Sequence, residues 1–334
     1  MRRHGIGALA GLVLAGALAG CAAQEEAALD KVRVCEVTHS IFYAPQYAAL
    51  ELGFFEDEGI EVELSNGGGA DKVMSAVLSD NIDIGFAGPE ASIYVYNEGK
   101  EDHTQVFAQM TRRDGSMLVG RTPEEDFDWK NLAGAHILPG RKGGVPYMAF
   151  EYAIRQSGLD PETDVYLDTS VQFDNMTGAF LGGTGDYVTM FEPSASSVQA
   201  EGKGYIVAAV GDAAGDLPYT AYFAKKSYLD ENADLVQRFT NAVYRGQQWV
   251  ASHTPEEVAK AVSPQFADTD LALLESAVAN YQKVGAYSTE PALARESFDK
   301  LQQIMREAGE LDETAPFDEV VNNTFAERAV QDAA

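Results

Sequence analysis

Cysteine is scarce in this chain, since Cys21 and Cys35 are the two cysteines among 334 residues. Two cysteines allow one disulfide at most, which excludes a disulfide-stapled scaffold. His and Cys residues do not recur at metal-ligand spacing, so we expect no metal site. The sequence also lacks a GxxxxGK[ST] phosphate loop and a GxSxG nucleophile elbow. We therefore expect a protein that is not an enzyme and that needs no cofactor.

Basic residues are also few: 24 Lys and Arg stand against 52 Asp and Glu, which gives a formal net charge of −28. Nucleic-acid-binding proteins carry basic patches, so this composition argues against a nucleic-acid partner. The hydrophobic fraction of 46% predicts a packed core. The length is sufficient for two lobes of ordinary size.

One long apolar run is present, Ile6–Ala19, and it follows two arginines. A membrane-spanning helix needs roughly 20 residues, so this shorter run fits the core of a signal peptide. It leads into the tetrapeptide LAGC at 18–21, which resembles the bacterial lipobox, whose cysteine is lipidated and becomes the mature N-terminus.

We therefore expect a lipoprotein signal peptide over 1–20, lipidation of Cys21 and a polar tether over 21–30. The protein would be exported and held on the extracytoplasmic face of a cell membrane through the lipid. Cys35 would then have no disulfide partner within the chain, and its strand-like surroundings predict a small buried apolar residue.

From Lys31 onward, strand-like segments alternate with helix-like segments, and the same order starts again near Ala135. This alternation predicts an α/β fold with mainly parallel sheets flanked by helices. We expect lobe 1 over 31–118 plus 220–334 and lobe 2 over 119–219. From Ala233 onward the pattern is helical, and we expect these helices to pack back on lobe 1.

One short pattern occurs in both halves. Asn81–Ser92 and Gly183–Ser196 each hold an acidic residue, an apolar strand and a turn with proline before a helix. Pro89 and Pro193 suit the first helical turn, where a missing N–H costs nothing. Ligands of open α/β sheets bind beyond the carboxyl ends of the strands. We expect the two turns to form opposite walls of one ligand cleft; two unrelated strand–turn–helix joints are the alternative.

Two motifs of the first half are more specific. One comprises Tyr43, Pro45, Ala48 or Ala49, Gly53, Phe54, Phe55, Gly59, Ile60 and Val62, and the other comprises Leu78, Asp83, Ile84 and Gly85. Together with the lipobox, they resemble the type 2 periplasmic solute-binding proteins of ABC importers. The nearest branch holds the binders of nitrate, alkanesulfonates, taurine and thiamine-pyrimidine precursors.

This resemblance covers most of the chain, from Lys31 to Val330, and its motifs are less specific in the second half. It implies the two-lobed type 2 fold of periplasmic binding proteins and a small-molecule ligand held between the lobes. It also implies an ABC permease and ATPase as partners, and a monomeric protein.

Several candidate ligand contacts would suit a flat, nitrogen-rich ligand. Aromatic rings can stack on such a ligand, and a carboxylate accepts its N–H groups in charge-assisted hydrogen bonds. Glycines let the backbone approach it closely. These candidates are His39, Phe42, Tyr43, Gly68, Gly69, Gly88, Pro89, Glu90, Phe191, Glu192 and Tyr219.

The turn GRKGG at 140–144 favours a different ligand. Arg141 beside Gly143, before the first helix of the second half, could hold an anionic group with the help of backbone N–H groups. A solvated basic turn is the alternative explanation. The predicted ligand is a thiamine-type aminopyrimidine or a similar flat heteroaromatic, and a sulfonate, nitrate or other small organic anion is the second candidate.

Two other functions share the expected fold. A fungal pyrimidine-synthesis enzyme has it too, but that enzyme depends on a cysteine-rich iron-binding segment, for which this chain offers Cys35 alone. A sensor or structural surface protein is not excluded by any motif.

Overall fold

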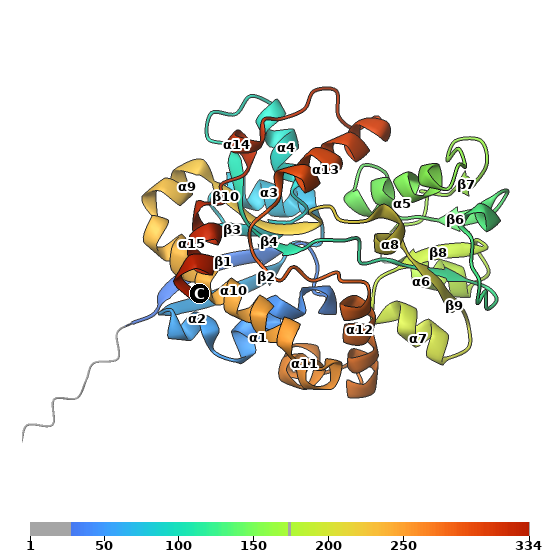
Figure 1. Cartoon of the computed structure of the whole chain (residues 1–334), viewed down its shortest axis with the longest axis horizontal. Coiled ribbons are helices and arrows are strands. Elements are labelled where there is room, and N and C mark those ends of the chain that lie inside the picture. The colour runs from blue at the N-terminus through green and yellow to red at the C-terminus, as the bar shows by residue number, and fades with distance from the viewer. Residues whose placement is uncertain (1–27, 173–174, 334) are drawn as a thin grey trace, which may run out of the picture.

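The structure is a computed structural model that describes residues 28–172 and 175–333 (Figure 1). The expected signal peptide, Cys21 and residues 22–27 of the expected tether lie outside the described residues. The rest of the chain forms two lobes side by side, each built on a five-stranded sheet flanked by helices.

The first sheet has the strand order β2-β1-β3-β10-β4. Its strands are β1 (Asp30–Glu36), β2 (Ile60–Asn66), β3 (Ile84–Ala87), β4 (Thr104–Thr111) and β10 (Thr220–Lys225). β1 pairs in parallel with β2 and β3, whereas β10 runs antiparallel to β3 and β4. Cys35 lies buried in β1, as the apolar strand pattern around it predicts.

The second sheet has the strand order β7-β6-β8-β5-β9. Its strands are β5 (Met117–Gly120), β6 (His136–Leu138), β7 (Tyr166–Leu167), β8 (Tyr187–Met190) and β9 (Tyr205–Ala209). β6 is parallel to β7 and β8, and β5 is antiparallel to β8 and β9. The two sheets correspond position by position, with β8 in the place of β3. The predicted two-lobed α/β fold is confirmed, and each sheet is mixed rather than wholly parallel.

Helices connect the strands within each lobe. Those of the first lobe are η1 (Ile41–Tyr43), α1 (Ala44–Glu51), α2 (Phe54–Asp57), α3 (Ala70–Leu78), α4 (Glu90–Asn97) and α9 (Lys226–Glu231). Those of the second lobe are η2 (Trp129–Leu132), α5 (Val145–Gln156), α6 (Met176–Leu181), α7 (Ser194–Ala200) and α8 (Val210–Ala214). α1 and α2 are separated at Gly53, whose φ of 74° ends α1 in the left-handed region that glycine favours.

The C-terminal segments are helical, as predicted. They are α10 (Ala233–Ser252), α11 (Pro255–Val262), η4 (Ser263–Phe266), α12 (Leu271–Lys283), α13 (Arg295–Glu307), α14 (Phe317–Val320) and α15 (Thr324–Ala333). α10 packs on α1 and α15, and α15 packs on β4, so this part covers lobe 1. α12 also touches α7, and α13 also touches α5, so these two helices reach lobe 2 as well (Figure 1). Within the described residues, no helix is long and apolar enough to cross a membrane.

Two short segments carry the chain between the lobes, and they run side by side. The first follows β4 and comprises residues 112–116; the second precedes β10 and comprises residues 215–219. The Leu217 N–H donates to the Arg112 carbonyl at 3.0 Å, and the Tyr219 N–H donates to the Thr111 carbonyl at 3.1 Å. All of β5 pairs in the second sheet and so belongs to lobe 2. We therefore place the first crossing at 112–116, whereas the sequence predicts that lobe 1 ends at 118 and lobe 2 begins at 119.

Candidate ligand-binding site

A cluster of aromatic side chains lies where the two lobes meet, and Phe42 is at its centre. Phe42 belongs to η1, beyond the carboxyl end of β1, and is 1% exposed. Its ring lies 5.6 Å from Tyr43, 5.8 Å from Phe191, 5.5 Å from Tyr219 and 4.9 Å from Tyr281, measured between ring centroids. Phe191 follows β8 of lobe 2, so the cluster joins both lobes and one crossing.

Glu90 stands at the start of α4, directly after the Pro89 turn. Its carboxylate lies over Gly88, where a Cβ would be only 1.9 Å from the Oε2 atom, so a larger residue at 88 would have to displace this carboxylate. Glu90 is 6% exposed, and among the described residues its Oε2 atom has no hydrogen-bond partner. Burial raises the pKa of Glu90 to about 7, although its own backbone N–H and the charge of Arg141 act in the opposite direction.

Asp114 lies in the first crossing and is 1% exposed. Its Oδ1 atom accepts hydrogen bonds from the Ser116 backbone N–H, at 2.6 Å, and from the Ser116 hydroxyl. Its Oδ2 atom has no partner within the part of the chain that the structure describes. Burial raises the pKa of Asp114 to about 7 against the effect of these hydrogen bonds.

The Tyr219 hydroxyl, in the second crossing, is likewise a buried polar group without a partner among the described residues. Burial raises the pKa of Tyr219 well above its usual value, and the charges of Asp114 and Glu90 raise it further. The interaction with Tyr219 also lowers the pKa of the Asp114 carboxyl group. The two side chains nevertheless do not satisfy the geometry of a hydrogen bond. Tyr219 therefore interacts electrostatically with both carboxyl groups.

A cavity of about 500 Å³ opens between the α3 and α4 helices of lobe 1 and the turn at 141–143 of lobe 2. Arg141, Lys142 and Gly143 line its lobe 2 side, and Glu90 lines its lobe 1 side. The two basic side chains are exposed, whereas the carboxylate of Glu90 is buried. Asp71, Glu98 and Glu310 line the cavity as well, so it carries charges of both signs, with an unpaired acid within its wall.

Glu192 follows β8, in the place that corresponds to the Glu90 turn. Both of its oxygens already have partners: Oε2 accepts from the Ser196 N–H at 2.9 Å, and Oε1 accepts from the Asn280 side chain at 2.6 Å. The Ser196 hydroxyl donates to Oε1 as well, at 2.8 Å. Because Asn280 lies on α12, Glu192 binds the C-terminal helices to lobe 2 and offers a ligand no unused oxygen.

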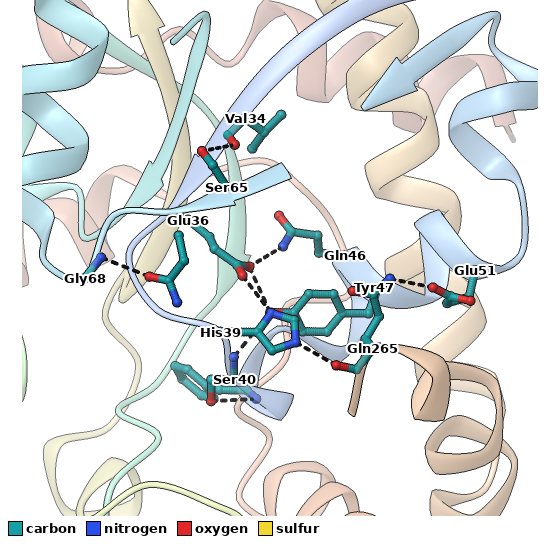
Figure 2. Close-up of polar contacts among 12 residues, drawn as sticks. Val34, Glu36, His39, Ser40, Gln46, Tyr47, Glu51, Ser65, Gly68 and Gln265 are labelled. Atoms are coloured by element: carbon teal, nitrogen blue, oxygen red, sulfur yellow. Dashed lines mark hydrogen bonds and ion pairs between the residues drawn. The ribbon is translucent and has the colours of Figure 1, made fainter. Parts of the chain in front are cut away.

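His39 is likewise engaged within the protein. Its Nδ1 atom lies 2.7 Å from the buried Glu36 carboxylate, and its Nε2 atom lies 2.9 Å from the Gln265 carbonyl (Figure 2). Glu36 also accepts from Gln46 and Tyr47. The hydrogen bond to Glu36, aided by that to Gln265, raises the pKa of His39. This side chain joins the end of β1 to η4.

The glycine loop after β2 lies beside α3, which forms part of the cavity wall. The Gly68 N–H is not free to bind a ligand, because it donates to the Asn66 side chain at 2.9 Å (Figure 2). The Gly69 N–H donates to the Val37 carbonyl at 3.1 Å. Both glycines have positive φ angles, +66° and +154°, so the loop needs them for its conformation.

Comparisons with known proteins agree with this architecture. Residues 37–263 match the NMT1-like family. YtlA of Bacillus subtilis (strain 168), whose name describes it as a binding protein, is 42% identical over 330 residues, which cover 99% of this chain and 98% of YtlA. The chain belongs to the NMT1-like family.

Solved structures with the fold of this NMT1-like protein include periplasmic binding proteins. The aliphatic sulphonate binding protein SsuA from Escherichia coli has a TM-score of 0.70 at 14% identity, covering 87% of this chain and 97% of SsuA. The nitrate-binding protein NrtA from Synechocystis PCC 6803 has a TM-score of 0.70 at 16% identity, covering 91% of this chain and 89% of NrtA. At these identities the likeness shows a shared fold.

In this member of the NMT1-like family, the structure brings together some of the predicted site residues and gives others a structural role. Phe42, Tyr43, Phe191 and Tyr219 gather between the lobes, and Gly88, Pro89, Glu90, Arg141 and Gly143 border the cavity or its wall. Sequence reasoning missed Asp114. An Asp before a glycine is an ordinary turn signal, and the burial that makes it unusual arises only when the two crossings pack together. In the described residues, no group of three His, Cys, Asp or Glu side chains could hold a metal ion.

Proposed function

We propose that this protein is the extracytoplasmic substrate-binding component of an ABC importer. Its membership of the NMT1-like family, its similarity to YtlA and the fold it shares with SsuA and NrtA support this assignment. The ligand would bind between the lobes, which are joined by two short crossings and can close around it. An ABC permease and ATPase would be its partners, and the protein would act as a monomer held to the membrane by a lipid on Cys21.

The proposed ligand is a flat amino-substituted heteroaromatic, such as the aminopyrimidine of thiamine. The observation that carries this proposal is the aromatic cluster around Phe42, which also contains the unpaired Tyr219 hydroxyl. Rings at such positions can sandwich a planar ligand once the lobes separate. The nearby acids Glu90 and Asp114 can accept its N–H groups, the role that the sequence assigned to Glu192.

A small organic anion is the second candidate, and Arg141 favours it. Arg141 and Lys142 line the cavity between the lobes, and either cation could hold a sulfonate or nitrate group. The buried Glu90 carboxylate in the same cavity opposes an anion, because two negative charges would be placed close together in a region of low water content.

Thermal unfolding with a defined panel tests the two candidates, since a ligand that binds only the folded protein raises its melting temperature. The panel is 4-amino-5-hydroxymethyl-2-methylpyrimidine, taurine and nitrate, each at millimolar concentration. We expect stabilisation by the aminopyrimidine, reduced in Tyr219→Phe and unchanged in Arg141→Ala. Stabilisation by taurine or nitrate that disappears in Arg141→Ala would replace the aminopyrimidine with an anion.

A further inference from the structure

Glu90 and Tyr94 lie one turn apart on α4, and each has a buried polar atom without a hydrogen-bond partner among the described residues. These atoms are Glu90 Oε2 and the Tyr94 hydroxyl oxygen. Residues four apart on a helix share one face, with about 5–6 Å between their Cβ atoms. Both side chains line the cavity of about 500 Å³ between α3, α4 and the turn at 141–143. Two unpartnered buried polar groups in one cavity wall point to a molecule that supplies the missing partners.

The surroundings of Glu90 favour the uncharged form of its carboxyl group. The side chain is 6% exposed, whereas the basic side chains that share its cavity are all exposed to solvent. A buried carboxylate without a counter-ion is costly, and such a group keeps its proton instead. The pKa of Glu90, which burial raises to about 7, agrees with this. In the ligand-free protein, Glu90 is therefore a neutral acid at mildly acidic pH.

The other titratable groups around the cavity do not change this charge state. All the charged ones except the half-buried Glu310 are exposed, so water screens their charges. The acids among them oppose a further negative charge on Glu90. The phenols Tyr43, Tyr94 and Tyr219 stay uncharged, because burial, and to a lesser extent the charge of this acid, raises their pKa values. The charged residues that line the cavity besides Glu90 are Asp71, Glu98, Lys100, Arg141, Lys142 and Glu310.

A neutral carboxyl group and a phenol offer a specific set of hydrogen bonds. The protonated carboxyl group has an O–H donor beside a C=O acceptor, and the phenol hydroxyl can donate or accept. An uncharged ligand edge with an N–H donor next to an acceptor matches the carboxyl group with two parallel hydrogen bonds. A primary amide and an amino-substituted nitrogen heterocycle both have such an edge. A carboxylate lacks the donor and an amidinium lacks the acceptor, and either would be buried there without a counter-ion.

We propose that Glu90, in its protonated form, and Tyr94 bind an uncharged edge of the ligand that places an N–H donor beside an acceptor. This inference rests on the proposed function, because it assigns the charge and the hydrogen-bonding edge of the solute that the lobes capture. Both atoms are covered in this arrangement of the lobes, so the ligand reaches them when the turn at 141–143 moves away from α4. Loss of the proton from Glu90 removes the donor of the pair, so binding weakens as the pH rises.

Four single-ring compounds of similar size test this proposal. Benzamide has both the donor and the acceptor, acetophenone lacks the donor, benzamidinium is a cation and benzoate is an anion. Calorimetric titration of each compound at pH 6 and pH 8, at constant ionic strength, is carried out on the full protein and on Glu90→Gln, Glu90→Leu and Tyr94→Phe. Glutamine is the uncharged counterpart of a protonated glutamate, since its amide keeps a donor beside an acceptor. Glu162→Gln is the control, because Glu162 is an exposed acid of lobe 2 that does not line the cavity.

We expect benzamide to bind best at pH 6. Its affinity should fall about 10-fold between pH 6 and pH 8, because the protonated fraction of a carboxyl group with a pKa of about 7 falls by that factor. At pH 8, binding should take up close to one proton. The control Glu162→Gln should keep both the affinity and this pH dependence.

Glu90→Gln should bind benzamide equally at both pH values, close to the affinity of the unmodified protein at pH 6 and without proton uptake. Glu90→Leu loses two hydrogen bonds and Tyr94→Phe loses one, so at pH 6 they should bind about 10-fold and about 3-fold more weakly. A merely structural role of Glu90 would not produce a pH dependence that glutamine removes while it keeps the affinity.

The results that would overturn the inference are distinguishable from failure of the proposed function. If benzoate, benzamidinium or acetophenone binds at pH 6 as well as benzamide, or if the affinity for benzamide is independent of pH or is lost in Glu90→Gln, the lobes capture a solute but Glu90 does not act as a neutral partner. If benzamide does not bind while the aminopyrimidine, taurine or nitrate does, the inference fails and the proposed function stands. If none of these compounds binds, both fail. Should Glu90→Leu not fold, Glu90→Gln and Tyr94→Phe still decide the outcome.

Discussion

The Phe42 ring fills the space in which a side chain at Gly115 would lie. A Cβ atom at Gly115 would be 2.4 Å from the ring, and the backbone φ of Gly115 is not in the positive region, so the constraint is steric. Phe42 belongs to lobe 1 and Gly115 to the first crossing, which shows that the aromatic cluster fixes the position of the crossing.

Gly115→Ala should therefore destabilise the protein. Overpacking of a filled core typically costs about 1–3 kcal/mol, so thermal unfolding should show a melting temperature lowered by several degrees. The double variant Gly115→Ala/Phe42→Leu replaces the ring with a smaller side chain and should recover part of the lost stability. Gly178→Ala is the matched control, because Gly178 lies in α6 with open space around its Cβ position, and alanine there should raise stability by about 0.5–1 kcal/mol. Equal effects of the two Ala variants would contradict the packing argument.

Asn280→Ala should weaken the contact between α12 and lobe 2. It removes one of the two side-chain donors to Glu192 Oε1, at 2.6 Å, while the Ser196 hydroxyl remains at 2.8 Å; loss of one such hydrogen bond typically costs about 0.5–1.5 kcal/mol. We expect a lower melting temperature and a larger radius of gyration in solution scattering, both without any ligand. Ser276→Ala, on the exposed side of the same helix, is the control. If Asn280→Ala changes ligand affinity alone, Glu192 belongs to the binding site and our structural interpretation of it is wrong.

Glu192 and Asp114 show where sequence reasoning succeeds and where it stops. The alternation of strands and helices is local, so the two lobes, the corresponding Pro turns and most helices could be predicted from the sequence. The partners of Glu192 could not, because Asn280 is 88 residues away and reaches it only through the packing of α12 on α7. Position after a strand indicates a rim residue, but it does not show whether its oxygens are already bonded.

Asp114 was missed for the opposite reason. Its neighbours Arg113 and Gly115 resemble an exposed turn, and Arg113 is indeed half-exposed and paired with Asp216 at 2.6 Å. The Asp114 carboxylate between them is nevertheless buried. A short segment that crosses between lobes has one face toward solvent and one toward the cleft, and no periodic pattern reveals which residue faces inward.

Membrane attachment should depend on Cys21 and not on Cys35. In cells that express the full chain, Cys21→Ser should move the protein from the membrane fraction to the soluble extracytoplasmic fraction, because lipid is attached through the thiol. Cys35→Ala is the control for general effects of cysteine loss, since Cys35 is buried in β1. A Cys21→Ser protein that remains with the membrane would contradict the proposed lipid anchor.

The ligand-free protein should become less stable as the pH rises from about 4 to about 8. The pKa values of Glu90 and Asp114 rise from 4.5 and 3.8 to about 7 on folding, so the folded form retains protons that the unfolded form loses. Stability is then fully present below about pH 4 and is lost as the pH approaches 7; at about 1.4 kcal/mol per pKa unit, Glu90 contributes about 3–4 kcal/mol and Asp114 about 4–5 kcal/mol. The pKa of His39 is also raised, chiefly by Glu36, and the stability from its charged form is lost as the pH rises above about 6.5.

Thermal unfolding at pH 5, 6, 7 and 8 and constant ionic strength measures this dependence. The double variant Glu90→Gln/Asp114→Asn should lose most of the decline between pH 5 and 7, because neither amide titrates. The double variant should keep the decline in stability above about pH 6.5 that His39 causes. The variant His39→Gln removes that decline separately. Carboxyl groups whose pKa is lowered on folding, such as Asp216 and Asp168, act at more acidic pH and do not obscure this window. A double variant that declines as steeply as the unmodified protein between pH 5 and 7 would show that these two acids are ionised in the ligand-free fold.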